Sequence, residues 1–352
     1  MADPITLDWG LPLKVWEYPQ PQEIAATVED FLRQLAGPTL IRLRGYEEDR
    51  TRVVVTLLHG NEPSGVIAIH KLLREGFKPL VNCEFLIVCV KTALLEPIFS
   101  NRFIAPWRDM NRCFKPPYED PQGKLAEAIL HYLSSREAEA VIDIHNTSGN
   151  GPSFAVCCHQ IERSFDIASL FTERLISTHH RIGALMERDE LGYPIVTIEC
   201  GGAGQAASHQ LAESGLRRFL TEHELYHVAD HSKLDLYPNP VRLELLNGTR
   251  ICYADAPDAS ADITLARNID ALNFGVVDSA TPLAWLNQGA RCYRMVNEMG
   301  VDCADDFVEV RGNQLFPKGP MKLFMVTTNP VIAKSDCLFY AVKEQDHQTL
   351  FA

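Results

Sequence analysis

Two candidate metal ligands follow an apolar run early in the chain. Residues 53–58 read VVVTLL, which predicts a strand buried on both faces of a mainly parallel sheet. His59 and Glu62 come directly after this run, and histidine and carboxylate side chains are both common zinc ligands. By itself, an HxxE sequence is more often a strand end followed by a glutamate at a helix N-terminus, so a metal site requires further ligands.

The residues around these two ligands predict a local geometry. Gly60 is expected to let the backbone turn sharply out of the strand, and Pro63 is expected in the first turn of a helix. Open α/β sheets bind ligands at the carboxyl ends of their strands, and His59 and Glu62 fall at such an end.

A second histidine ends another short apolar strand. Residues 140–145 read AVIDIH, and a parallel sheet would bring His145 to the same edge as His59 and Glu62. Two histidines and one carboxylate leave a fourth zinc position open for water or substrate, which is the composition of a catalytic zinc site. Asp143 lies on the same strand face as His145 and could orient a ligand by a hydrogen bond.

Glu199 ends a third predicted strand, in the sequence TIECGGAG. The glycines after it allow close approach of the backbone, and the carboxylate could act as general base toward a water molecule. Taken alone, such a residue is more often an ordinary glutamate before a turn.

A cluster of arginines lies in the sequence NRFIAPWRDMNRCF. Arg102, Arg108 and Arg112, with Asn111 beside the last, could hold a carboxylate by paired hydrogen bonds or stabilise an oxyanion. The alternative is a solvated loop with surface ion pairs, which contribute little. Residues 92–121 form a long connection with several prolines, and a loop of this length in a compact domain is usually functional.

The elements that must position these residues alternate between strands and helices, which predicts an α/β fold with a mixed, mainly parallel sheet flanked by helices. We expect domain 1–236 to carry the site and domain 237–352 to be smaller and mostly β. The first domain is predicted to have strands at 39–43, 53–58, 84–90, 140–145, 154–158 and 194–200, and helices at 22–36, after Glu62, and at 123–133, 162–177 and 205–220. The second is predicted to have hairpins at Asn247-Gly248 and Gly312-Asn313 and one helix near 263–272.

Composition excludes several classes of protein. The chain has 352 residues and a net charge of -13, which argues against nucleic acid or an anionic membrane as the main partner. No apolar stretch is long enough for a transmembrane helix, and the N-terminal sequence lacks the features of a signal peptide, so we expect a cytoplasmic protein. Its 10 cysteines form no CxxC pair and are expected to be reduced. The sequence leaves open whether the protein is a homo-oligomer.

Four motifs in order, HGNE, DMNRCF, DIHNTSGNG and YPIVTIECGG, resemble the aspartoacylase and succinylglutamate desuccinylase family of zinc hydrolases. This family is related in fold to the zinc carboxypeptidases, so the resemblance implies a zinc-carboxypeptidase-like fold. It also implies that His59, Glu62 and His145 bind one Zn²⁺ per chain and that Glu199 activates the water.

The resemblance extends to residues that would bind the substrate. Asn111 and Arg112 match the pair that holds the carboxylate of the amino-acid part. Arg102 is our choice for the arginine that polarises the scissile carbonyl, with Arg108 as the alternative. Arg188 corresponds, after a gap of one residue, to an arginine that binds a second carboxylate of the substrate.

Two departures from the family pattern concern substrate fit. The chain shows no clear match to a tyrosine that the family's C-terminal domain contributes, although Tyr293 and Tyr340 are candidates. Residues 201–204 are GGAG where the family has a glycine-proline turn. Both departures leave the acyl group and the amino acid open.

The function expected from these residues is that of a zinc-dependent amidohydrolase. Its substrate would be a small N-acyl amino acid of the N-acylaspartate or N-succinylglutamate type. The alternatives are a metallocarboxypeptidase-like enzyme acting on a short or modified peptide, and a non-catalytic zinc-binding or ligand-binding relative. A competing metal site of His223, His227 and His231 is less favoured, because neighbouring acidic residues suggest an exposed polar face.

Overall fold

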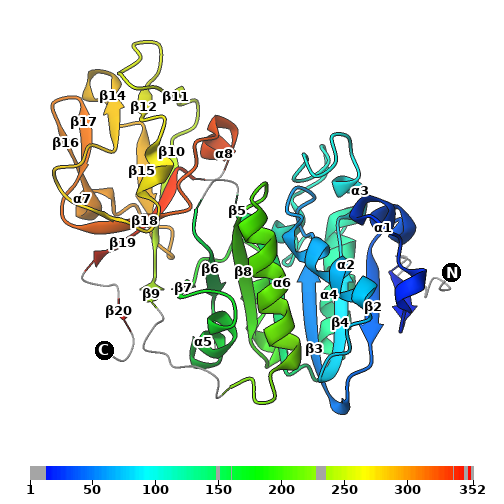
Figure 1. Ribbon diagram of the computed structural model, residues 1–352. Coiled ribbons are helices and arrows are strands. Elements are labelled where there is room, and N and C mark those ends of the chain that lie inside the picture. Colours follow the sequence, from blue (N-terminus) through cyan, green and yellow to red (C-terminus); the bar gives the residue numbers. More distant parts are fainter. Residues whose placement is uncertain are drawn as a thin grey trace. The chain divides into compact units, whose positions relative to one another are not determined.

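The computed structural model describes residues 13–147, 151–159, 161–226, 235–335, 337–344 and 348–349. The chain forms two compact units, and Figure 1 shows the elements of both. The first unit comprises Met1–Asn146, Ser153–Leu175 and Arg181–His231. The second comprises Thr147–Pro152, Ile176–His180 and Ser232–Ala352, so two short segments from the earlier part of the chain belong to it.

The first unit is built on a mixed sheet. Its strands follow the order β1-β2-β4-β3-β5-β8-β6-β7, with β3 parallel to both β4 and β5 and with β6 antiparallel to β8. Val53, Val54 and Val55 in β3 are completely buried, which confirms the predicted strand covered on both faces. The strands are β1 (Lys14–Glu17), β2 (Thr39–Leu43), β3 (Glu47–Thr56), β4 (Val81–Ile87), β5 (Ala140–Thr147), β6 (Phe154–Cys157), β7 (Arg174–Ser177) and β8 (Ile195–Gly202).

Helices connect these strands, and α2 and α6 lie side by side (Figure 1). Local sequence explains several of their ends. Asp120 caps α4 by accepting a hydrogen bond from the backbone N–H of Gly123, and α2 ends at Gly76, whose φ of 67° suits glycine. The helices are α1 (Val28–Leu35), α2 (Ser64–Glu75), α3 (Val90–Ala93), α4 (Pro121–Ser134), α5 (Ile161–Ser169) and α6 (Ala206–Thr221), with short 3-10 turns η1 (Pro21–Glu23), η2 (Met110–Arg112), η3 (Leu185–Glu187) and η4 (Asp189–Leu191).

The predicted helix over residues 162–177 is too long. Helix α5 ends at Ser169, and Arg174–Ser177 form strand β7. Leu175 and Ile176 are both buried, so consecutive side chains on opposite faces of this strand are covered. Short apolar segments fit a helix or a buried strand equally well, and tertiary packing decides between them.

The second unit is rich in β structure, with two five-stranded sheets of order β13-β18-β19-β10-β15 and β11-β12-β14-β17-β16. Leu243, Met295, Leu323 and Ala341 lie in its core and are completely buried. Its strands are β9 (Asp235–Pro238), β10 (Val241–Leu245), β11 (Ile251–Tyr253), β12 (Ile263–Leu265), β13 (Val276–Val277), β14 (Ala284–Leu286), β15 (Tyr293–Val296), β16 (Val308–Arg311), β17 (Gln314–Pro317), β18 (Met321–Phe324), β19 (Phe339–Lys343) and β20 (Gln348–Thr349), with 3-10 turns η6 (Ile269–Leu272) and η7 (Asn287–Gly289) and short helices α7 (Ala304–Phe307) and α8 (Pro330–Ser335).

One of the two predicted hairpins of this unit is confirmed. Strands β16 and β17 pair antiparallel across Gly312, which has a φ of 63°. The hairpin predicted at Asn247-Gly248 is wrong, because β10 pairs with β15 and β19 while β11 pairs with β12 in the other sheet.

The helix predicted near 263–272 is also wrong. Ile263–Leu265 form strand β12, and only the 3-10 turn η6 follows it. None of the helices in the described part of the chain is long and apolar enough to cross a bilayer.

Candidate metal centre

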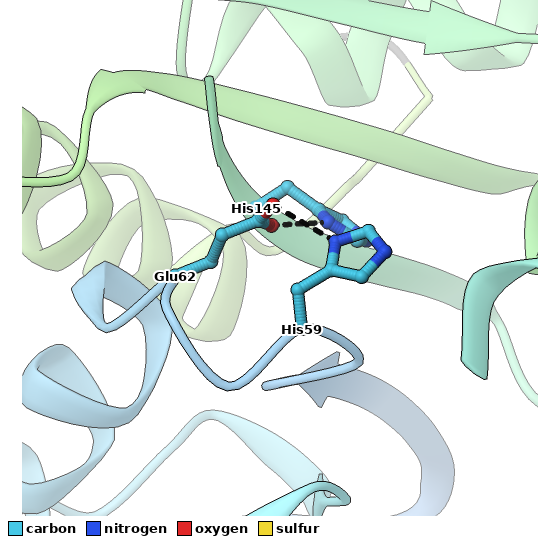
Figure 2. A group of neighbouring side chains, drawn as sticks. All are labelled: His59, Glu62 and His145. Atoms are coloured by element: carbon cyan, nitrogen blue, oxygen red, sulfur yellow. Dashed lines mark hydrogen bonds and ion pairs between the residues drawn. The ribbon is translucent and has the colours of Figure 1, made fainter. Parts of the chain in front are cut away.

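Three buried side chains of the first unit converge at the edge of the sheet where β3 and β5 end (Figure 2). His59 and Glu62 lie between β3 and α2, and His145 lies in β5. Because β3 and β5 are parallel neighbours, their carboxyl ends bring these residues together. One ligand atom from each residue lies within 4.8 Å of the others. The Nδ1 atoms of His59 and His145 are 2.8 and 2.6 Å from the two carboxylate oxygens of Glu62.

A second carboxylate orients each histidine. His59 Nε2 is 2.9 Å from Asp109 Oδ1, and His145 Nε2 is 2.7 Å from Asp143 Oδ2. When each Nε2–H donates to its aspartate, each Nδ1 presents a lone pair toward Glu62. The structure therefore places Asp143 beside His145, as the sequence suggested.

The electrostatics of the cluster suit a cation. Burial would raise the pKa of Glu62, but His59 and His145 outweigh it and hold that pKa well below the usual range. Burial opposes the charge of His145, yet Asp143 and Glu62 raise its pKa well above the ordinary value. His59 Nδ1 is buried and has no hydrogen-bond partner of good geometry. With both histidines neutral, their two Nδ1 lone pairs and the Glu62 carboxylate form a donor set that fits a divalent metal ion, whose charge would replace the proton that the raised pKa places on His145.

Glu199 lies near the end of β8, where its Oε2 atom is buried without a hydrogen-bond partner among the described residues. Burial is the largest influence on this carboxyl and raises its pKa to about 7. His145, Glu62 and His59 also act on its charge, which agrees with a position near the cluster. A carboxyl with a pKa near neutrality suits proton transfer at physiological pH.

Of the predicted arginines, Arg102 has a contact with one of the three candidate ligands, Glu62. Its Nη1 is 3.4 Å from Glu62 Oε1, and its Nε is 2.8 Å from Asp109 Oδ2. Asp109 therefore joins Arg102 to His59, since its other oxygen contacts that histidine. Burial would raise the pKa of Asp109, but His59 and Arg102 lower it well below the usual range.

Arg108 has different partners. Its Nε is 2.5 Å from Asp120 Oδ2, and its Nη2 donates to Pro117 O at 2.8 Å. These contacts lie at the N-terminus of α4, where Asp120 is the cap residue. They favour Arg102 over Arg108 as the arginine beside the cluster.

The other predicted substrate-binding residues lie on two loops that contact each other. Asn111 Oδ1 accepts a hydrogen bond from the backbone N–H of Leu185 at 3.1 Å, and Arg112 Nη1 donates to Asn111 O at 3.0 Å. Arg188 Nη1 donates to Phe114 O at 2.8 Å, and the same guanidinium pairs with Glu190. Asn111 is also near Asp109, which accepts a hydrogen bond from its backbone N–H.

Gly60 serves a different purpose from the one predicted. Leu57 has the positive φ in this turn, at 60°, and Gly60 does not have a positive φ. A Cβ atom at Gly60 would lie 2.6 Å from Thr92 Cγ2 and 2.7 Å from Asn101 O. Its backbone N–H donates to Arg102 O at 3.0 Å. Gly60 therefore permits close approach of the loop that carries Arg102.

Sequence reasoning missed two residues that support the site. Asp109 belongs to the DMNRCF motif, and Asn146 follows His145 in DIHN, so both lie inside the sequence motifs that contain predicted site residues. The side-chain amide of Asn146 donates to Ser64 Oγ at 2.8 Å and to Gly201 O at 2.9 Å. Asn146 thus joins the segments that follow Glu62, His145 and Glu199.

Ser64 lies 2.8 Å from His209 Nδ1, a pairing that resembles a nucleophile and its base. The side chain of Ser64 is completely buried, so this pair supports the loop after Glu62. Of the competing histidine site, His223 contacts Glu47, whereas His227 and His231 lie outside the described residues.

Within the described part of the chain, His59, Glu62 and His145 are the one group found that could hold a metal. Tyr293 and Tyr340 lie in β15 and β19 of the second unit.

Comparison with known proteins agrees with this geometry. Residues 49–221 match the family model described as the succinylglutamate desuccinylase/aspartoacylase catalytic domain. All four motifs fall in this range. This match to the succinylglutamate desuccinylase/aspartoacylase family confirms the resemblance seen in the sequence.

Solved structures share the fold over most of the chain. Succinylglutamate desuccinylase from Vibrio cholerae is 12% identical, with coverage of 91% of this chain and 95% of that chain and a TM-score of 0.58. The corresponding protein from Chromobacterium violaceum is 15% identical over 86% and 88%, with a TM-score of 0.56. Murine aminoacylase 3 is 16% identical over 84% and 95%, with a TM-score of 0.53. No curated protein sequence matches the chain.

Proposed function

We propose that the protein is a zinc-dependent amidohydrolase that removes the acyl group from a small N-acyl amino acid of the N-acylaspartate or N-succinylglutamate type. The observation that supports this most strongly is the buried triad of His59, Glu62 and His145, in which two aspartates turn both Nδ1 atoms inward. The match to a family named for desuccinylase and aspartoacylase activities supports the type of bond and substrate. One Zn²⁺ per chain would be held by these three residues.

The chain's own residues divide the work of hydrolysis. Zinc bound to the triad supplies Lewis acidity toward a water molecule and an amide carbonyl. Glu199 takes the proton of the attacking water at its unpartnered Oε2 and delivers it to the nitrogen of the leaving amine. Arg102, held by Asp109, stabilises the negative charge that develops on the carbonyl oxygen.

Other cationic and polar groups bind the substrate. Asn111 and Arg112 hold the carboxylate of the amino-acid part by charge-assisted hydrogen bonds. Arg188 binds a second carboxylate of the substrate. Arg108 is the alternative to Arg102, and its pairing with Asp120 gives it a supporting place in the loop.

Metal content and a substrate panel test this proposal together. Elemental analysis of the wild type should find about one zinc per chain, and His145→Ala should lose it. The exposed His131 provides the matched control, because His131→Ala should keep the metal. Zinc absent from the wild type after reconstitution would refute the proposed cofactor.

Turnover is then measured on N-acetylaspartate, N-succinylglutamate and other N-acyl amino acids, beside dipeptides. Release of the free amino acid from the first group supports the proposal, and cleavage of dipeptides alone would indicate a carboxypeptidase. Glu199→Gln should keep zinc and lose turnover. Full activity of this variant would refute the role of Glu199.

A further inference from the structure

A buried glutamate organises the loop beside Asn111. Glu187 closes the 3-10 turn η3 and is 7% exposed. Its Oε1 atom accepts hydrogen bonds from the backbone N–H groups of Ile182, Gly183 and Ala184 at 2.8, 2.9 and 3.0 Å. Three successive N–H groups therefore converge on one carboxylate, which fixes the conformation of this turn.

The turn contacts the segment that carries Asn111 and Arg112. Gly183 O accepts a hydrogen bond from the backbone N–H of Phe114 at 3.0 Å. Gly183 has a φ of 92°, and a Cβ atom there would lie 2.6 Å from Arg112 O. Only glycine permits this approach, so the two segments are fitted closely to each other.

The contact between Leu185 and Asn111 determines which way the side-chain amide of Asn111 faces. The backbone N–H of Leu185 can only donate, and it does so to Asn111 Oδ1 at 3.1 Å. Since the carboxamide is planar, its NH₂ group points away from Leu185. Asn111 is 8% exposed, so a reversed amide would leave a buried N–H facing another N–H.

We infer that Glu187 is a positioning residue for recognition of the substrate carboxylate. By holding the turn over residues 182–185, it places the Leu185 N–H so that Asn111 presents its NH₂ group, and not its oxygen, to a carboxylate. A carboxylate accepts hydrogen bonds from an NH₂ group and is repelled by an amide oxygen. This inference rests on the proposed function, in which Asn111 binds the carboxylate of the amino-acid part.

Two single variants and their combination test the inference. Glu187→Gln removes the charge that gathers the three N–H groups. Asn111→Asp keeps an oxygen for Leu185 but replaces the NH₂ donor by a second oxygen. The substrate is N-acetylaspartate or N-succinylglutamate, whichever the wild type hydrolyses better. We expect each variant to raise KM for this substrate by about 10-fold or more and to change kcat by less than about threefold.

If Glu187 acts through Asn111, the double variant should be little worse than Asn111→Asp alone. Glu173→Gln makes the same chemical change at an exposed position and should leave KM unaltered. Glu187→Ala removes every acceptor and should give a larger increase in KM than Glu187→Gln.

Substrate binding is also measured directly by calorimetry in the Glu199→Gln background, with zinc content and melting temperature as further readouts. We expect zinc to stay at about one per chain while the affinity falls as KM rises. Multiplicative losses in the double variant, or a fall in kcat or zinc content at constant KM, would overturn the inference.

The two failures are distinguishable. If Asn111→Asp leaves KM and affinity unchanged, the proposed role of Asn111 fails, and the inference fails with it. If Asn111→Asp weakens binding while Glu187→Gln and Glu187→Ala do not, only the inference about Glu187 fails.

Discussion

Replacing Glu199 by glutamine should stabilise the metal-free protein, and the gain should increase with pH. Burial of this carboxyl raises its pKa from 4.5 to about 7. Between these two values the folded protein keeps a proton that the unfolded chain has released. Because the folded state then binds more protons, the free energy of unfolding falls as the pH rises through this interval. A neutral glutamine of nearly the same size avoids the cost of burying a charge.

The size of the effect follows from the two pKa values. The ionisable Glu199 lowers the free energy of unfolding by about 1 kcal/mol at about pH 5 and by about 3 kcal/mol at about pH 8. The advantage of Glu199→Gln should therefore grow by about 2 kcal/mol between these conditions. Below the unfolded value both states are protonated, and the advantage should vanish.

Urea denaturation of chelator-treated protein, followed by circular dichroism at both pH values, measures this difference. The exposed Glu173 is the control, since Glu173→Gln should show no dependence of the difference on pH. An advantage of Glu199→Gln that is equal at both pH values, or a loss of stability at the higher pH, would refute the reasoning that burial penalises this charge.

Four further substitutions test the surroundings of the candidate metal centre. Asp109→Asn should weaken zinc binding by about 10- to 100-fold, because it removes the carboxylate that orients His59. Competition with a chromogenic chelator measures this affinity. An unchanged affinity would contradict the role of Asp109. Gly60→Ala should lower the free energy of unfolding by about 1 to 3 kcal/mol, because the new Cβ would meet the backbone oxygen of Asn101. The change would be seen as a lower melting temperature. An unchanged melting temperature would show that the loop can move aside. Arg102→Lys should reduce kcat by about 100-fold and Arg108→Lys much less; equal losses in steady-state assays would contradict the choice between these arginines.

The three candidate ligands and their order along the chain could be predicted from sequence because they depend on local features. An apolar run ending in HxxE and a second strand ending in histidine indicate a metal site once a parallel sheet is assumed. The pairing of β3 with β5 then brings His59, Glu62 and His145 together. The hairpin at Gly312 was predictable for the same reason, since its turn residues act on their immediate neighbours.

Partner choice between distant segments was decided only in the tertiary structure. Asn247-Gly248 is a pair of residues typical of hairpin turns. The strands on its two sides nevertheless pair in different sheets. Residues 174–177 suit a helix by periodicity and form a strand because both faces become buried. In each case the free energy of packing outweighs a local preference of modest size.

The same distinction separates the candidate metal ligands from the residues that support them. The sequence by itself identified His59, Glu62 and His145 as a group, because ligand chemistry is a property of residue type. Only the folded chain shows that Asp109 joins His59 to Arg102 and that Gly60 makes room for the backbone of Asn101. These contacts depend on distances between segments far apart in the sequence, and neither residue type nor spacing along the chain determines such distances.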